Sequence, residues 1–163
     1  LLYLFCEATV MAKPISQLIP DFREALGKGL EEAAENIVDG LIDDGPYWDG
    51  VFAASWMVKK GKRSIPAYIP SALKRSGVAQ KKPSSFDHLI PTIPDNENLE
   101  GYTIGNMTEY RGYAMDLLPT TVGRQMGNAP NKTARKDWFI LYVQGGRMKK
   151  RFDTAMTNVF KKY

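Results

Sequence analysis

Apolar residues recur three and four positions apart along the first third of the chain and predict one long amphipathic helix over residues 20–44. Its buried stripe is expected to contain Phe22, Leu26, Leu30, Ala33, Ala34, Ile37, Val38, Leu41 and Ile42. The opposite, solvent-facing side is expected to carry the acidic residues Glu31, Glu32 and Glu35. Asp21 and Glu24 have the spacing of a capping box after Pro20, and Gly45 predicts the end of the helix.

A turn, a short helix and a strand are expected immediately after this long helix. Pro46 and Gly50 are turn-forming residues, a short helix is expected over residues 48–54, and a strand over residues 55–60. The first nine residues of this segment, 46–54, also hold three aromatic residues, Tyr47, Trp48 and Phe52. Such rings either form a ligand cage or pack in a core. Core packing is the preferred interpretation, because aromatic side chains dominate core burial.

The C-terminal part of the chain predicts one more strand and further helices. Residues 101–106 are typical of a strand, and residues 109–118 indicate a turn followed by a short helix. Residues 137–143 are apolar enough for a buried helix or a strand, and their length does not decide between the two. Residues 147–161 are expected to be helical, with an apolar stripe of Met148, Phe152, Ala155, Met156, Val159 and Phe160. The basic face of this last helix is expected to lie against the acidic first helix, within one subunit or between two.

Residues 61–100 show no sustained period and are punctuated by prolines. Loops of this length are uncommon in compact domains, so an extended, basic, proline-rich arm or hairpin is expected there. The predicted fold class is α+β, with a small, mostly antiparallel sheet packed against a long N-terminal helix and a C-terminal helix. We expect a single domain, with residues 15–60 and 101–163 as its core and residues 1–14 as an N-terminal arm.

Composition and charge narrow the class of protein. The 163 residues are 44% hydrophobic and 25% charged, which excludes a collagen-like chain, a coiled-coil rod and a disordered acidic tail. The net charge is +4, but residues 21–50 hold nine acids against two bases. Residues 59–82 hold eight bases and no acid, and residues 134–163 hold eight bases against two acids. Such blocks are either solvated faces or complementary patches that join copies of the chain head to tail.

Few side chains in the sequence suit catalysis. The single cysteine, Cys6, excludes an internal disulfide framework, and the single histidine, His88, excludes most histidine-based catalysis. The sequence contains neither a phosphate-binding glycine loop nor a nucleophile elbow. A base formed by Asp87 and His88 is the less favoured alternative, because a lone loop histidine is usually structural or solvated. We therefore expect no enzymatic activity and no catalytic, cofactor or metal site.

Two segments are candidates for contact with a partner. The chain opens with an apolar run that is too short for a membrane span, so we expect it to dock on a neighbouring molecule and expect no membrane partner. An upstream extension before Met11 is the alternative. This run consists of Leu1, Leu2, Tyr3, Leu4 and Phe5. The second segment would suit a DNA backbone or an acidic protein, and its candidates are Lys59, Lys60, Lys62, Arg63, Lys74, Arg75, Lys81 and Lys82.

Three motifs follow one another along the chain. A Pro-x-x-x-Gly-x-φ-x-x-Ser-φ pattern follows the long helix, an asparagine closes the second expected strand and is followed by a Tyr-Ala pair, and a tryptophan precedes the last helix. The motif residues are Pro46, Gly50, Phe52, Ser55, Trp56, Asn106, Tyr113, Ala114 and Trp138. This order, over residues 20–60 and 101–163, resembles the neck or tail-completion proteins of tailed bacteriophages, which join the head to the tail.

The resemblance implies a structural virion protein, assembled in the host cytoplasm, that forms a homo-oligomeric ring in the phage neck. Its neighbours would be the portal or adaptor protein on one side and tail terminator, tail tube or sheath proteins on the other. Genomic DNA would pass through the lumen without sequence-specific contacts. Two alternatives remain open at this stage: a tail terminator ring, and a small basic DNA-binding module.

Overall fold

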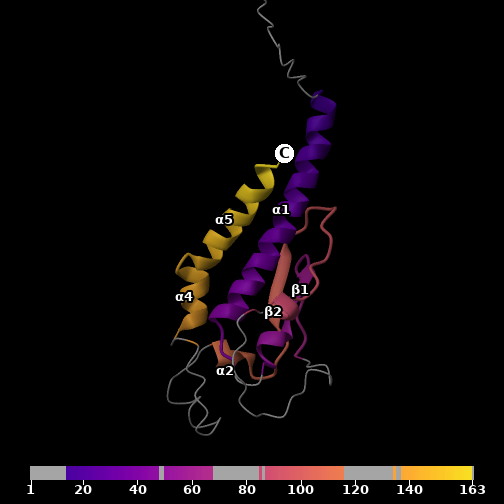
Figure 1. The fold of residues 1–163 in the computed structure, drawn as a ribbon. Coiled ribbons are helices and arrows are strands. Elements are labelled where there is room, and N and C mark those ends of the chain that lie inside the picture. The colour runs from indigo at the N-terminus through magenta and orange to yellow at the C-terminus, as the bar shows by residue number, and fades with distance from the viewer. Residues whose placement is uncertain are drawn as a thin grey trace, which may run out of the picture.

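The structure is a computed structural model that describes residues 14–47, 50–67, 85, 87–115, 134 and 137–162. Its centre is a 30-residue helix, α1 (Ile15–Asp44), with the C-terminal helix α5 (Arg147–Phe160) along one side and a two-stranded sheet on another (Figure 1). The strands β1 (Trp56–Lys60) and β2 (Tyr102–Asn106) pair antiparallel. The expected α+β fold class is therefore confirmed. Among the helices of the described residues, none combines the length and the apolar character needed to cross a membrane.

The end of α1 agrees with the sequence prediction, but its beginning does not. The helix starts at Ile15, with Pro20 inside it, and Pro14 rather than Asp21 occupies the N-cap position. The capping box predicted at Asp21 and Glu24 is therefore wrong. Proline removes only its own N–H donor, and here the affected turn is exposed, so the helix continues on its N-terminal side. At the other end the Gly45 N–H donates to the Leu41 carbonyl at 3.1 Å, as a helix-ending glycine should.

The two strands lie where the sequence placed them, to within one residue. The register pairs Trp56 with Asn106 and Lys60 with Tyr102. A short 3-10 helix, η1 (Ala53–Ser55), leads into β1 in place of the longer helix predicted over residues 48–54. On the face of the sheet that meets the core, the described apolar residues are Trp56, Val58, Tyr102 and Ile104.

The other face of the sheet is covered by the chain that leaves β1. The Gly61 N–H continues the ladder to the Gly101 carbonyl at 2.6 Å, and the chain then turns back over β2. The Arg63 N–H donates to Thr103 Oγ1 at 3.2 Å, and the Ile65 side chain packs over Gly105, where a Cβ would lie only 2.8 Å from it. Gly105 is thus needed for this close approach.

Part of the segment predicted as an arm packs against the body. Next to the 3-10 helix η3 (Asp87–Leu89), three apolar residues are partly buried against the core: Leu89, Ile90 and Ile93. The Asn96 N–H donates to Glu31 Oε1 of α1 at 2.6 Å, and the Asn96 side chain makes two hydrogen bonds with the backbone of Glu100. The Glu31 carboxylate therefore binds this loop instead of facing solvent as predicted. Residues 68–84 and 86 of the expected arm lie outside the described residues.

The hydrophobic core lies between α1, the sheet and the short helices α2 (Arg111–Met115) and α4 (Trp138–Gln144). The open choice for residues 137–143 is thus settled in favour of a helix. The Trp138 indole N–H donates to the Ala114 carbonyl at 2.8 Å, and the Tyr142 hydroxyl donates to the Ile37 carbonyl at 2.9 Å. The core consists of Ala34, Val38, Leu41, Ile42, Phe52, Ala53, Trp56, Val58, Ala114, Trp138 and Tyr142.

Candidate functional site

The motif residues meet at one buried hydrogen-bonded centre. The side chain of Asn106, which is 1% exposed, donates through Nδ2 to the Phe52 carbonyl at 2.8 Å. Its Oδ1 accepts hydrogen bonds from the N–H and the hydroxyl of Thr108, at 3.0 and 2.7 Å. The Met107 N–H donates to the Ser55 carbonyl at 2.8 Å, so the segment before β1 is fastened to the segment after β2. Two motifs that lie about 50 residues apart therefore form one structural unit.

Phe52, Trp56 and Trp138 of the motifs also pack in the core. Phe52 packs edge-on against Trp56 and Trp138, with ring centroids 5.7 and 6.3 Å apart. Gly50 has a φ of +85°, a conformation that favours glycine, and its carbonyl accepts from the Ala54 N–H. The core-packing interpretation of the aromatic segment is thus confirmed for Phe52, while Trp48 lies outside the described residues.

The basic residues near β1 do not all face solvent. Lys59 and Lys60 are half-buried and, as neighbours in a strand, point to opposite faces of the sheet. The Lys59 ammonium donates to the Ser64 carbonyl at 3.1 Å, whereas Lys62 and Arg63 are exposed. The other candidates for partner contact lie outside the described residues: Leu1, Leu2, Tyr3, Leu4, Phe5, Lys74, Arg75, Lys81 and Lys82.

The acidic and basic blocks of the sequence meet in part within one chain. Arg147 pairs with Asp44 and Arg151 with Asp39, both at 2.7 Å. Arg151 also donates to the Asn36 carbonyl at 3.1 Å. The sequence left open whether the basic face of the last helix meets the acidic helix within one subunit or between two. These contacts lie within one subunit.

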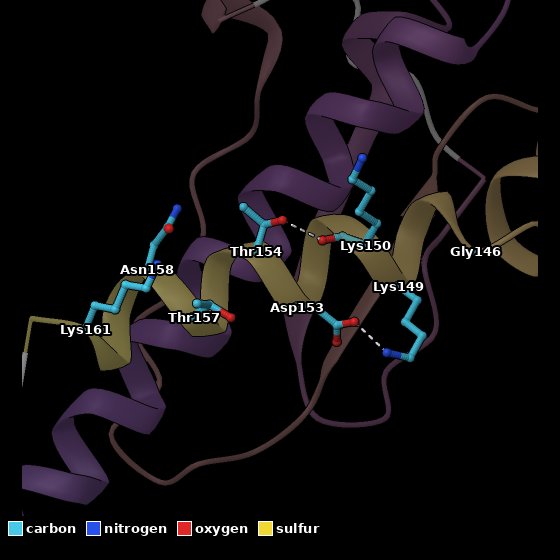
Figure 2. Close-up of a pocket in the computed structure, with 8 residues that line it drawn as sticks. All are labelled: Gly146, Lys149, Lys150, Asp153, Thr154, Thr157, Asn158 and Lys161. Carbon is cyan, nitrogen blue, oxygen red and sulfur yellow. Dashed lines mark hydrogen bonds and ion pairs between the residues drawn. The ribbon is translucent and has the colours of Figure 1, made fainter.

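A second set of basic side chains lines the outward face of α5, where sequence reasoning singled out no site (Figure 2). Lys149, Lys150 and Lys161 border a shallow hollow of about 430 Å³ together with hydroxyl and amide side chains of the same helix. Lys149 forms an ion pair with Asp153 one turn away. Among the described residues no acid pairs with Lys150 or Lys161, so both are available to an anion.

The most distinctive surface is an apolar groove at the N-terminal end of α1, which projects beyond the rest of the body (Figure 1). Its volume is about 590 Å³, and we call it the α1 groove. It is lined by Leu18, Ile19, Asp21, Phe22, Arg23, Ala25, Leu99 and Phe160. Phe22 is 58% exposed although the sequence predicted it to be buried, and Ile15, one turn before the groove, is 78% exposed. The expectation of a fully buried stripe is therefore wrong at this end.

Sequence reasoning missed the α1 groove because the helix was expected to begin near Pro20. The spacing of Ile15, Leu18, Ile19 and Phe22 continues the helical stripe and is the signal that could have shown it.

A smaller apolar surface lies at the other end of the molecule, on α4. Ile140 and Leu141 are 47% and 45% exposed, and we call this pair the α4 ridge. Both side chains are exposed, whereas Trp138 and Tyr142 of the same helix are buried against the core.

Two phenols in the packed region keep their protons far into the alkaline range. Burial raises the pKa of Tyr142 to about 12, and the nearby carboxylates of Asp44 and Asp39 add to the effect of burial, against Arg151 and Arg147. Burial, followed by the charges of Glu31 and Asp95, raises the pKa of Tyr102 to about 12. Both hydroxyls are therefore neutral hydrogen-bond donors at neutral pH, to the carbonyls of Ile37 and Pro94 respectively.

Chemistry beyond binding has little support in the part of the chain that the structure covers. Within it, no three His, Cys, Asp or Glu side chains are grouped to hold a metal ion. Asp87 is exposed on η3. No protein-family model, no curated protein and no solved structure matches the chain. The function proposed below therefore rests on the sequence motifs and on the surfaces described above.

Proposed function

We propose that this chain is a non-catalytic structural subunit that binds other copies of itself and adjoining proteins, as a ring component of a phage neck. The α1 groove is the observation that carries this proposal. It places several large apolar side chains on a helix end that has little of the described part of the chain beside it.

The exposed apolar area at this end is near the upper limit of what a protein that stays alone shows in its largest apolar patch. At roughly 200 Å² for a fully exposed large apolar residue, Ile15, Leu18, Ile19, Phe22 and Phe160 leave about 550 Å² in water. The largest apolar patch of a typical monomer spans about 300–600 Å² and is often functional. A projecting helix end is also marginally stable by itself, because helices gain most of their stability from packing. Covering the groove with another protein would therefore stabilise this end.

The resemblance to neck proteins supplies the setting of the proposal. It predicts a ring between the portal or adaptor and the tail terminator, tube or sheath proteins, located in the virion and traversed by genomic DNA. The buried centre around Asn106 gives Phe52, Ser55 and Asn106 of the motifs a structural role, because their hydrogen bonds hold the two halves of this chain together. The docking surface itself lies on α1, outside those motifs.

The test compares two variants that place the same charge on α1. Phe22→Asp puts a carboxylate in the groove, whereas Ser16→Asp puts one on an exposed position that does not line it. We expect the wild type and Ser16→Asp to form particles several times the 18.3 kDa chain mass in light scattering, with rings in electron micrographs. Phe22→Asp should remain folded by circular dichroism but lose the large species. A wild type that stays at 18.3 kDa and ignores portal, adaptor and tail proteins would contradict the proposal.

A second candidate function is sequence-indifferent binding of a nucleic-acid backbone, and the exposed lysines of α5 favour it (Figure 2). Lysines near phosphates are sufficient for such binding, and each contact steepens its salt dependence. The double variant Lys150→Glu, Lys161→Glu should abolish duplex binding at low salt if α5 is responsible. The matched double variant Lys62→Glu, Arg63→Glu tests the exposed bases after β1. A wild type without DNA affinity at low salt would exclude this function.

A further inference from the structure

We infer that the α4 ridge of one copy docks into the α1 groove of the next copy, so that identical chains associate head to tail. This inference rests on the proposed function and specifies which two surfaces of the subunit meet. Three observations carry it: the shapes of the two surfaces, their separation and their size.

The two surfaces have complementary shapes, because the α1 groove is concave and the α4 ridge is convex. The α1 groove is a hollow between the first turns of α1, the loop residue Leu99 and the end of α5, where the rings of Phe22 and Phe160 lie 5.6 Å apart. The α4 ridge is convex, because Ile140 and Leu141 stand out from a helix. Recognition of a helix face by an apolar groove is a recurring mode of protein association.

The ridge is held rigidly by its own subunit. On the inner side of α4, Trp138 and Tyr142 are 3% and 1% exposed, and each donates a hydrogen bond to a backbone carbonyl of another helix. Ile140 and Leu141 are therefore presented in a fixed orientation, which reduces the entropy that docking would cost.

The two surfaces lie at opposite ends of the α1–α5 pair. Phe22 meets Phe160 at one end, whereas Asp44 meets Arg147 next to α4 at the other. The 22 residues of helix between Phe22 and Asp44 span about 33 Å at 1.5 Å per residue. A rigid subunit therefore cannot place its own ridge in its own groove. Two different surfaces at opposite ends give a heterologous contact, which closes into a ring or continues as a filament.

The size of the groove also fits a second protein copy. Its surroundings expose about 550 Å² of apolar surface, estimated as above, against about 800 Å² per partner in a standard protein interface. The groove would thus form the centre of such an interface, with polar residues such as Arg23 at its rim. A few buried apolar anchors at the centre supply most of the affinity of such contacts.

The test uses one variant for each surface. Phe22→Asp disables the groove and Leu141→Asp disables the ridge, while Thr154→Asp places the same charge on an exposed position of α5 that belongs to neither surface. In a head-to-tail assembly each of the first two variants alone should be monomeric, because every contact needs both surfaces. A mixture of the two retains one intact groove and one intact ridge. It should therefore form a dimer of twice the 18.3 kDa chain mass and nothing larger.

The outcomes separate this contact from the proposed function. A 1:1 dimer in the mixture, with normal assembly of Thr154→Asp, would establish the contact. Normal assembly of Leu141→Asp would overturn it and indicate an isologous pairing through α1, and a mixture that stays monomeric would overturn it as well. If the wild type binds portal, adaptor or tail proteins but not other copies of itself, the contact between the α4 ridge and the α1 groove is excluded. The proposed role as a structural subunit that binds adjoining proteins would still hold. Circular dichroism of each variant ensures that loss of assembly is not loss of folding.

Discussion

Asn106 offers the most demanding test of the structural interpretation, because one buried side chain joins two distant motifs. Replacing it with alanine removes three hydrogen bonds at once: one to the Phe52 carbonyl and two from Thr108. Asn106 and Thr108 are 1% and 0% exposed, so water cannot easily replace the lost partners.

The expected loss can be worked out from the groups left behind. The Thr108 N–H becomes buried and unsatisfied, which costs about 1–3 kcal/mol, whereas the Phe52 carbonyl still accepts from the Ser55 N–H at 3.2 Å and loses one hydrogen bond worth about 0.5–1.5 kcal/mol. The Thr108 hydroxyl can rotate and adds less. Asn106→Ala should therefore lower the free energy of unfolding by about 2–4 kcal/mol. For a chain of this size that corresponds to a fall in Tm of about 10 °C.

Urea unfolding followed by tryptophan fluorescence measures this loss at a fixed protein concentration. Asn98→Ala is the matched control, because Asn98 is exposed and its removal should change the free energy by less than about 0.5 kcal/mol. A loss below about 1 kcal/mol for Asn106→Ala would refute the reasoning, since it would mean that the buried hydrogen bonds contribute little to holding the motifs together.

Three further predictions concern the packing of α1 against its neighbours. Gly40→Ala should lower the free energy of unfolding by about 1–3 kcal/mol in urea, because its Cβ would collide with Tyr142 and Arg151, whereas Gly112→Ala has open space and should not destabilise. Equal effects would contradict this packing. Stability should fall between pH 10 and 12, because unfolded phenols ionise near pH 10 while Tyr142 keeps its proton to about pH 12. Tyr142→Phe should make this alkaline loss of unfolding free energy smaller by about 2 kcal/mol. A pH profile of stability that the substitution leaves unchanged would contradict the raised pKa of Tyr142. In urea titrations, Arg151→Ala should lower the free energy of unfolding by about 1 kcal/mol and Lys149→Ala by less than about 0.5 kcal/mol, because the Arg151–Asp39 ion pair is half-buried whereas the Lys149–Asp153 pair is exposed. A larger loss for Lys149→Ala than for Arg151→Ala would contradict this ranking of the two ion pairs.

The helices and strands with a regular apolar pattern were predictable from the sequence. The residues at which they begin, and whether another element packs on their apolar faces, were not. Apolar spacing identified α1, both strands and α5, because each has a face that packs. The start of α1 was wrong because Pro20 was taken as a first-turn residue, although it removes only one donor from a helix that continues beyond it. Periodicity also shows which face is apolar but not whether another element covers it. At Phe22 none of the described elements does so fully, since α5 ends at Phe160.

The functional surfaces were less predictable, because they depend on contacts between distant residues. The motif residues could be named one by one, but their meeting at Asn106 follows from the antiparallel register of β1 and β2. The opposite charges of the first and last helices indicated an attraction between them. Only the antiparallel placement of α1 and α5 shows that Arg147 and Arg151 pair within the chain, which leaves the lysines on the far side of α5 for other partners.

Amide hydrogen exchange over residues 15–22 tests the central claim most directly, because these turns of α1 form the proposed docking surface. In dilute protein they should exchange rapidly, since the helix end is exposed and unsupported. When the concentration is raised until the chain assembles, exchange over these residues should slow by at least about tenfold, while exposed residues 62–64, which do not line the groove, should change little. Assembly without any slowing over residues 15–22 would show that the subunits meet elsewhere and would contradict the account.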